Sequence, residues 1–309
     1  MWFRNLRIWR LDAPWTISSA DLGAALARDV FAPCAPGQAE TIGWEPPVAE
    51  QDDLMVREVA GRQLLRARVQ ERILPTGAVD EVLSERVAEL EAAEGGPVRG
   101  ARRRELADAV RAELLPKALL RSSRSWLLVD REAGLVLVDT ATAARGEALL
   151  TLLRGSLGNL GVRPLAFAQP LDGTLTAWLR SGELPDGFEL GQWCDLEHPE
   201  DTPNKVRFRG QPLDEDEVVA TLQRGLRVTA LELLWEAGGD EPLRCVLSED
   251  GAVRRLRIPA GDHDATISDD ESAAARLDAD LALLGLTLGR FFDALFPALG
   301  GVATDSATQ

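Results

Sequence analysis

Residues 98–124 read VRGARRRELADAVRAELLPKALLRSSR, and this stretch divides the chain into its parts. It carries seven arginines and one lysine against three acidic residues, in a protein whose formal net charge is −16. Positive charge gathered in an acidic chain is typical of a local anion-binding surface. The same run also fits an ordinary solvated helix face, and the charges by themselves favour that simpler interpretation.

The proline at position 116 leaves the course of the following residues open. If the chain continues as a helix past Pro116, then Lys117, Arg121 and Arg124 share one helix face. Leucines at positions 114 and 115 precede these cations, and those at 119 and 120 lie between them. We therefore expect an apolar surface beside the basic one.

Length and charge limit the classes of function. The chain has 309 residues, of which 45% are hydrophobic, and this is enough for a real core and for two or three domains. A uniformly acidic surface repels phosphate, so the net charge argues against general coating of nucleic acid. Any nucleic-acid site must be shaped and locally positive, as a channel or a groove would be.

Three cysteines bear on the compartment. Cys34, Cys194 and Cys245 lie far apart and form no CxxC pair, which favours reduced thiols over a disulfide framework or a zinc site. The opening residues, MWFRNLRIWRL, have no continuous apolar segment of the kind that signal peptides carry. No uninterrupted apolar run reaches the roughly 18–20 residues that a membrane span needs. These features predict a soluble, cytoplasmic protein without membrane contact.

The hydrophobic pattern predicts an α/β (α+β) protomer of several lobes. A strand is expected over 2–11, a helix over 20–30 and a strand over 62–72. A hairpin with Gly134 near its turn follows Trp126, and a helix covers 143–157. The predicted segments are a central α/β portion (1–75), a projecting helical lobe (76–125), a second central segment (126–180), a β-rich lobe with one helix (181–271), and a long amphipathic helix that returns to the centre before a disordered tail (272–309).

A second basic group lies in the β-rich lobe. Lys205, Arg207 and Arg209 alternate along KVRFRGQPL, and a strand would turn all three to one face. Val206 and Phe208 would then face inward. An edge strand protected from aggregation by charge gives the same pattern, and this explanation stays open.

Catalytic constellations are not apparent in the sequence. Neither His198 nor His263 stands in a known catalytic signature, and no nucleotide-binding glycine motif is present. The acids between 262 and 271 fit a solvated turn better than a cation loop. Asp278 and Asp280 fall on different faces of the last helix, which weakens a two-metal nuclease interpretation. We predict a protein that is not an enzyme and that uses no cofactor.

Taken together, the motifs resemble those of one bacterial family. In order along the chain they are WFRNL with RL, FAPC, GWEPP, RARVQERILP, LLPKAL, WLLVD, GLVLVD, LLRGSLG-x-L-x-VRPL, LTAWLR, G-x-x-VT-x-L-x-L-x-W and DG-x-x-RRLR. This order and spacing are similar to those of the RdgC family of recombination-associated proteins. The resemblance extends from Trp2 to about Gly301.

The resemblance implies a homodimer that closes head-to-head and tail-to-tail into a ring. Duplex DNA would pass through the ring and be bound without sequence preference, and single strands would also be bound. The family is associated with restraint of the RecA recombinase and with recombination and replication on the nucleoid, without an established enzymatic activity. Its members have central, tip and base portions, which here correspond to the central segments, to 76–125 and to 181–271.

Two family motifs can be carried over residue by residue. The tip motif LLPRAF falls on Leu114–Leu119, where Lys117 keeps the charge and Leu119 replaces an aromatic residue that could stack on a base. The basic turn of the base falls on Arg209, Gly210 and Gln211. The predicted DNA-contacting residues are Arg99, Arg102, Arg103, Arg104, Arg111, Lys117, Leu119, Arg121, Arg124, Lys205, Arg207, Arg209 and Gln211.

A rival hypothesis of a different class remains. The acidic chain could be a protein-interaction module that contacts recombination or replication proteins directly. Salt-sensitive DNA binding by the isolated protein separates the two hypotheses, because counterion release accompanies only phosphate contacts.

Overall fold

The computed structural model describes residues 3–48, 54–200, 204–236, 238, 241–259 and 272–303. Within these ranges the chain has a mixed α/β fold with one large antiparallel sheet and seven α-helices. The strands are β1 (Leu6–Leu11), β2 (Glu40–Glu45), β3 (Arg57–Val59), β4 (Arg62–Ile73), β5 (Leu119–Asp130), β6 (Leu135–Asp139), β7 (Val162–Pro164), β8 (Phe188–Glu197), β9 (Lys205–Arg209), β10 (Arg227–Trp235), β11 (Leu243–Ser248) and β12 (Val253–Arg257). The helices are α1 (Ser19–Leu26), α2 (Thr76–Glu94), α3 (Gly100–Leu114), α4 (Ala143–Leu157), α5 (Leu171–Ser181), α6 (Asp216–Gln223) and α7 (Ala273–Ala298), with the 3₁₀ helices η1 (Ala27–Asp29) and η2 (Leu115–Lys117).

The first strand of the chain lies in the middle of the sheet. The strand order is β2-β4-β5-β6-β1-β12-β11-β10-β8-β9, with β3 added to β4 and β7 added to β1. β1 pairs with β6 from Leu6 opposite Asp139 to Arg10 opposite Leu135. Its pairing with β12 is restricted to Leu6 opposite Val253. β1 therefore joins a β2–β6 half to a β8–β12 half.

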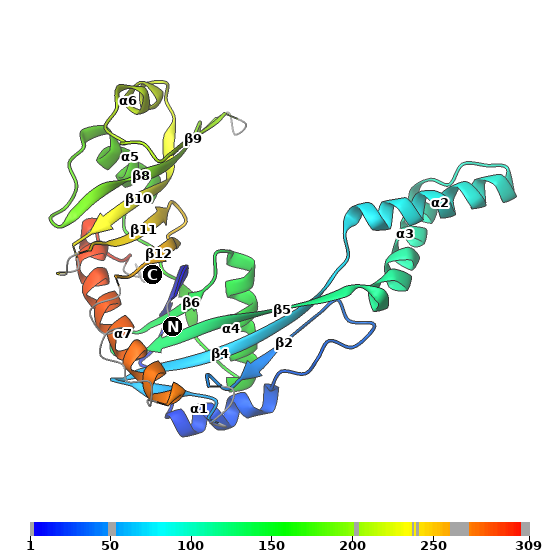
Figure 1. Ribbon diagram of the computed structural model, residues 1–309, viewed down its shortest axis with the longest axis horizontal. Helices are drawn as coiled ribbons and strands as arrows, with labels where there is room; N and C mark the ends of the chain where they lie inside the picture. The colour runs from blue at the N-terminus through cyan, green and yellow to red at the C-terminus, as the bar shows by residue number, and fades with distance from the viewer. Residues whose placement is uncertain are drawn as a thin grey trace, which may run out of the picture.

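Two apolar cores lie on opposite faces of this sheet. On one face, α5, α6 and α7 pack on the β8–β12 half and continue over β1, β4 and β6, with Phe291 and Leu281 fully buried. On the other face, α1 and α4 cover the β2–β6 half, where Trp44 is fully buried. In Figure 1, α5 and α7 lie on the outer side of β8–β12, away from the helical arm. The opposite face of β8–β12 carries no covering helix among the described elements.

Among the described helices, α7 has the length and the mean hydropathy, 1.4, that a membrane span could have. Its apolar side chains recur at helical spacing and enter the first core, whereas Leu286 on the other side is 59% exposed. This one-sided burial is that of an amphipathic helix packed on a sheet. The helix predicted over the last segment is confirmed.

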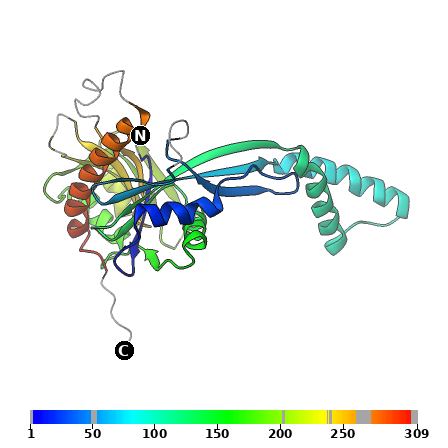
Figure 2. The ribbon, with the colours of Figure 1, turned by 90° about the horizontal axis from the view of Figure 1, so that it is seen from below.

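The long strands β4 and β5 carry the sheet outward into an arm (Figures 1 and 2). They pair continuously from Arg62 opposite Asp130 to Ile73 opposite Leu119. Both faces are buried near the centre, but the first six residues of β5 are exposed. At the far end α2 and α3 form a helical hairpin with a small core of Leu83, Val87 and Val98.

The structure corrects one expectation for this arm. The chain does not continue as a helix after Pro116, because η2 ends at Lys117 and strand β5 begins at Leu119. Pro116 has no N–H to donate to a helical hydrogen bond, and α3 gives way there to the short 3₁₀ helix η2, which contains this proline. The predicted hairpin between β5 and β6 is present, with Gly134 at a φ of +65°, and the predicted helix over 143–157 matches α4.

Candidate nucleic-acid interface

The cations after Pro116 do not share one face. Arg121 and Arg124 are an odd number of residues apart on strand β5, so their side chains leave opposite faces of the sheet. Arg121 forms an ion pair with Glu71, and Arg124 pairs with Glu45 at 2.6 Å. Lys117 is the last residue of η2, and its Nζ lies 3.5 Å from the Oε1 of Glu113. The predicted single basic stripe is therefore wrong, and these three charges are partly neutralised.

Helix α3 carries the remaining cations of the arm. Arg102 pairs with Glu94, and their hydrogen bond lowers the pKa of Glu94 and raises the pKa of Arg102. Arg111 pairs with Asp108 at 3.1 Å. The cations that are exposed and have no ion pair with a described residue are Arg99, Arg103 and Arg104. A short exposed basic surface at the start of α3 thus remains available to an anion.

An apolar patch lies where the arm turns from helix to strand. Leu119 is 80% exposed, Leu120 is 47% exposed, and Ile73 stands opposite Leu119 on β4. Ile73 and Leu119 face the same side of the strand pair, whereas Leu120 faces the other side. Scattered exposed apolar residues are common, but exposed ones gathered at the end of an arm are a candidate contact surface. Leu119, the residue that replaces the family's aromatic side chain, is at its centre.

The second predicted group lies on the edge strand β9 (Figure 1). Lys205, Arg207 and Arg209 are exposed on one face, and Phe208 is buried on the other, as predicted. Lys205 pairs with Glu197 at 2.9 Å, and Arg209 pairs with Asp195 at 2.7 Å. Arg207 has no ion pair with a described residue.

Sequence analysis missed an aromatic side chain at this site. Trp193 on β8 stands opposite Arg209 on β9, and the Arg209 guanidinium lies 3.3 Å from the centroid of its ring. The Arg255 guanidinium lies at the same distance from that ring. Beyond β9, Gly210 takes a φ of +70°, and Gln211 has a buried amide nitrogen without a partner among the described residues. Trp193 joins this site only because β8 pairs with β9. No local sequence pattern predicts that pairing.

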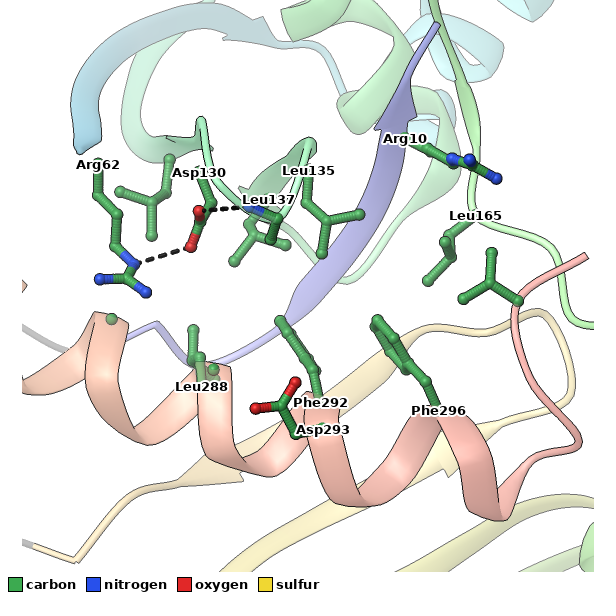
Figure 3. A pocket seen from close by; sticks show the side chains of 15 residues that line it. Arg10, Arg62, Asp130, Leu135, Leu137, Leu165, Leu288, Phe292, Asp293 and Phe296 are labelled. Atoms are coloured by element: carbon green, nitrogen blue, oxygen red, sulfur yellow. Dashed lines mark hydrogen bonds and ion pairs between the residues drawn. The ribbon is translucent and has the colours of Figure 1, made fainter. Parts of the chain in front are cut away.

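A cavity of about 440 Å³ lies between α7 and the sheet (Figure 3). Its wall is mostly apolar, with Phe292 and Phe296 of α7 facing Leu135 and Leu137. At one end the Asp130 carboxylate binds the Arg62 Nε at 2.8 Å and also accepts the backbone N–H of Ala133. The lining contains no serine, cysteine or histidine, so it offers no nucleophile–base pair.

The described residues contain no group of three or more histidine, cysteine or acidic side chains that could hold a metal ion. The acids predicted between 262 and 271 lie outside the described residues. Asp278, considered above as a nuclease ligand, instead binds Arg57 through both carboxylate oxygens, at 3.0 and 2.5 Å.

The sequence matches known proteins over nearly its whole length. A family model described as "Putative exonuclease, RdgC" covers residues 1–302. The chain is 35% identical to the recombination-associated protein RdgC of Shewanella frigidimarina over 304 residues, which are 97% of this chain and 98% of that protein. It is 35% identical to the protein of that name from Edwardsiella ictaluri (97% and 98%) and 33% identical to that of Salmonella paratyphi B (98% and 99%). The exposed cations at both ends of the sheet and these matches lead to one assignment: the chain belongs to the RdgC family of recombination-associated proteins.

Proposed function

We propose that this protein binds DNA without sequence preference, as a homodimer that closes into a ring around the duplex and limits the access of RecA-type recombinases. The observation that carries the proposal is the distribution of exposed cations. In a chain of net charge −16, basic side chains stand on the arm that extends from β4 and β5 and on the edge strand β9. A locally positive interior with an acidic exterior is what a ring that encloses an anion requires.

The proposed contacts are to phosphates rather than to bases. The exposed cations are arginines and lysines on a helix surface and on a strand, and no recognition-helix motif accompanies them. Such contacts position a protein on DNA and carry no sequence information. Because Leu119 cannot stack on a base as an aromatic residue could, binding of single strands would depend on the cations.

Two contacts would close the proposed ring. The exposed apolar pair of Ile73 and Leu119 would meet its symmetry mate at the end of the arm, since burial of apolar surface favours association. The turn at Gly210 and Gln211 would meet its mate at the other end, where the Gln211 amide nitrogen lacks a partner. The arm and the β9 end diverge from the central sheet, so two protomers could enclose a space between them (Figure 1).

A topological assay tests the ring. The protein is loaded at low salt on a plasmid that is either circular or linearised, and retention is measured after the salt is raised. A ring should stay on the circle and slide from the linear ends, whereas an open binder should leave both at the same rate. Light scattering after gel filtration tests the dimer, and assembly of RecA filaments on pre-bound DNA tests the effect on recombinases. No binding to any DNA at low salt would remove the proposal.

Two rivals have their own tests. The net charge of −16 favours an acidic module that binds recombination or replication proteins directly, and such a module would affect RecA without binding DNA. The description of the matching family model favours an exonuclease. Incubation of end-labelled DNA with magnesium or manganese tests that activity, and a labelled product that is lost with a chelator would support it. Action on the nucleoid in the cytoplasm belongs to the main proposal, which needs no cofactor.

A further inference from the structure

A cavity of about 650 Å³ opens on the face of the β8–β12 half that no described helix covers. Four separate segments of the chain line it: the residues before β1, and strands β10, β11 and β12. The lining residues are Arg4, Asn5, Glu232, Arg244, Arg255, Leu256 and Arg257. Four arginines against one carboxylate make this a strongly positive cavity, and none of its cations belongs to the groups predicted from the sequence.

The backbone holds the four arginines together. Arg244 and Arg257 stand directly opposite each other across β11 and β12. The N–H of Leu256 donates to the Arg4 carbonyl oxygen at 2.8 Å, which ties the chain before β1 to β12. The N–H of Arg255 donates to the Asn5 side chain at 3.3 Å. The cavity is therefore built by main-chain pairing and does not depend on the side chains finding one another.

The arginine side chains are exposed and have no ion pair with a described residue. Like charges directly opposite each other on a sheet are destabilising. The one acid of the lining, Glu232, already accepts the backbone N–H of Gln192 at 2.7 Å. On α3, by contrast, two of the four cations have an acidic partner, and on β9 two of the three do. Unpaired arginines that converge on a cavity form a site for an anion, because guanidinium groups match phosphate geometry in pairs of hydrogen bonds.

The backbone at Arg255 is strained, and its side chain has a defined position. Two non-glycine residues of the described chain have a positive φ, Ala60 at 50° and Arg255 at 52°. Ala60 lies in the tight turn between β3 and β4, and this turn accounts for its positive φ. Arg255 lies inside β12, next to an irregularity in the β11–β12 register. An arginine in the left-handed region costs free energy that a glycine would not, so such a residue points to a functional constraint.

The side chain of Arg255 lies on the ring of Trp193. Its guanidinium lies 3.3 Å from the ring centroid, and the ring is fixed by a hydrogen bond from its Nε1 to Asp195 at 2.9 Å. Stacking holds the guanidinium plane while its N–H edge stays available to a ligand. Because Arg209 stacks on the same ring, Trp193 connects the cavity to the cations of β9.

We propose that this cavity is a phosphodiester-binding site that seats the sugar–phosphate backbone of nucleic acid, with Arg244 and Arg257 as the paired contacts and Arg255 held in place by backbone strain and by Trp193. This proposal rests on the proposed DNA binding, and it adds where the sugar–phosphate backbone lies on the protein. The track would run from the cavity over Trp193 to Arg207. Free inorganic phosphate has the same chemistry but would fill only one point of this track.

The test compares R244Q/R257Q with R180Q, which removes an exposed arginine of α5 on the other face of the sheet. Fluorescence anisotropy of a random duplex is followed from low to moderate salt. The double variant should lose at least about tenfold in affinity, and the slope of log affinity against log salt should fall by about 2. R180Q should match the wild type. Equal behaviour of R244Q/R257Q and R180Q would overturn the site and leave the DNA function intact, whereas a wild type that fails to bind would overturn the DNA function.

The Arg255→Gly variant tests the strain separately, with Ala60→Gly as its matched control. Glycine relieves the positive φ in both, so neither variant should unfold at lower urea than the wild type. Arg255→Gly alone should lose DNA affinity. If Arg255→Gly unfolds more easily, or binds DNA as the wild type does, the assigned role of Arg255 is wrong. Calorimetric titration with inorganic phosphate distinguishes the two ligands. If the protein binds phosphate as tightly as it binds an oligonucleotide, the ligand of the cavity is free phosphate and not the nucleic-acid backbone.

Discussion

Arg121 on β5 lies directly opposite Glu71 on β4, and the two side chains form an ion pair. Both residues are in the exposed part of the arm, where an ion pair contributes little to stability. The ion pair matters for ligand binding, because the Glu71 carboxylate already partly neutralises the charge of Arg121 before any ligand binds. The charges most available to DNA on this arm are therefore those without an acidic partner.

The first prediction concerns these unpaired charges. Arg103→Gln/Arg104→Gln should weaken duplex binding and reduce the salt slope by about 2, since each lost phosphate contact lowers the slope by about 1. Arg121→Gln should have a smaller effect because its charge is already paired with Glu71. Anisotropy titrations at several salt concentrations measure both. A larger loss with Arg121→Gln would show that the ion pair opens when DNA binds.

The second prediction concerns the apolar patch of the arm. Leu119→Asp should weaken self-association by at least about tenfold, because a charge would replace an exposed leucine at the proposed contact. Leu286→Asp is the matched control, since Leu286 is also exposed, at 59%, but lies on α7. Sedimentation equilibrium gives both dissociation constants. If the two variants dimerise equally well, the contact lies elsewhere.

The third prediction is a pH dependence of the thiols. Burial raises the pKa of Cys194 and of Cys245 from 9.0 to about 12. Thiolate reagents should therefore not label either residue in the folded protein at pH 8, and should label both in urea. Unfolded thiols ionise above pH 9 while the folded ones stay protonated, so the free energy of unfolding should fall by about 1.4 kcal/mol per thiol for each pH unit between these values. Urea titrations at several pH values measure this fall in the free energy of unfolding for the wild type and for Cys194→Ala/Cys245→Ala. The part of the fall that these two thiols cause should be absent from the variant.

The fourth prediction concerns a close backbone contact. A Cβ on Gly43 of β2 would overlap the backbone of Phe31, which cannot move aside as a side chain can. Gly43→Ala should lower the free energy of unfolding by about 1–3 kcal/mol. Gly155→Ala in α4 meets nothing within 4 Å and should raise it by about 0.5–1 kcal/mol, because alanine favours helix. Urea denaturation ranks the two, and a neutral Gly43→Ala would mean that β2 shifts away from the Phe31 segment.

Local patterns predicted the elements whose residues interact along the chain. The hairpin of β5 and β6 has two short continuous apolar runs and a glycine near its turn, and α7 has apolar residues at helical spacing over about seven turns. The strand after Lys117 was missed because LLRSSR has no alternation of apolar and polar residues. Its partner β4 determines its conformation by pairing along the whole strand. Tertiary pairing here outweighs local propensity.

The candidate sites divide in the same way. The alternation of Lys205, Arg207 and Arg209 is readable within β9, and the structure has it. The cavity of Arg4, Arg244, Arg255 and Arg257 is assembled from both ends of the chain through strand pairing, and the positive φ of Arg255 has no sequence signature. The ion pairs that reduce the availability of Arg121 and Arg124 also depend on strand partners far along the chain.

The central position of β1 has a consequence for synthesis of the protein on the ribosome. The first strand to emerge has its partners at Leu135–Asp139 on one edge and at Val162–Pro164 on the other, and Leu6 also pairs with Val253, so its edges stay open until β6 and β7 have been made. Until then its backbone hydrogen-bonding groups are open to other strands, and late pairing of this kind slows folding and favours misassociation. Chains truncated before β6 should therefore depend on chaperones to a greater extent than the full-length protein.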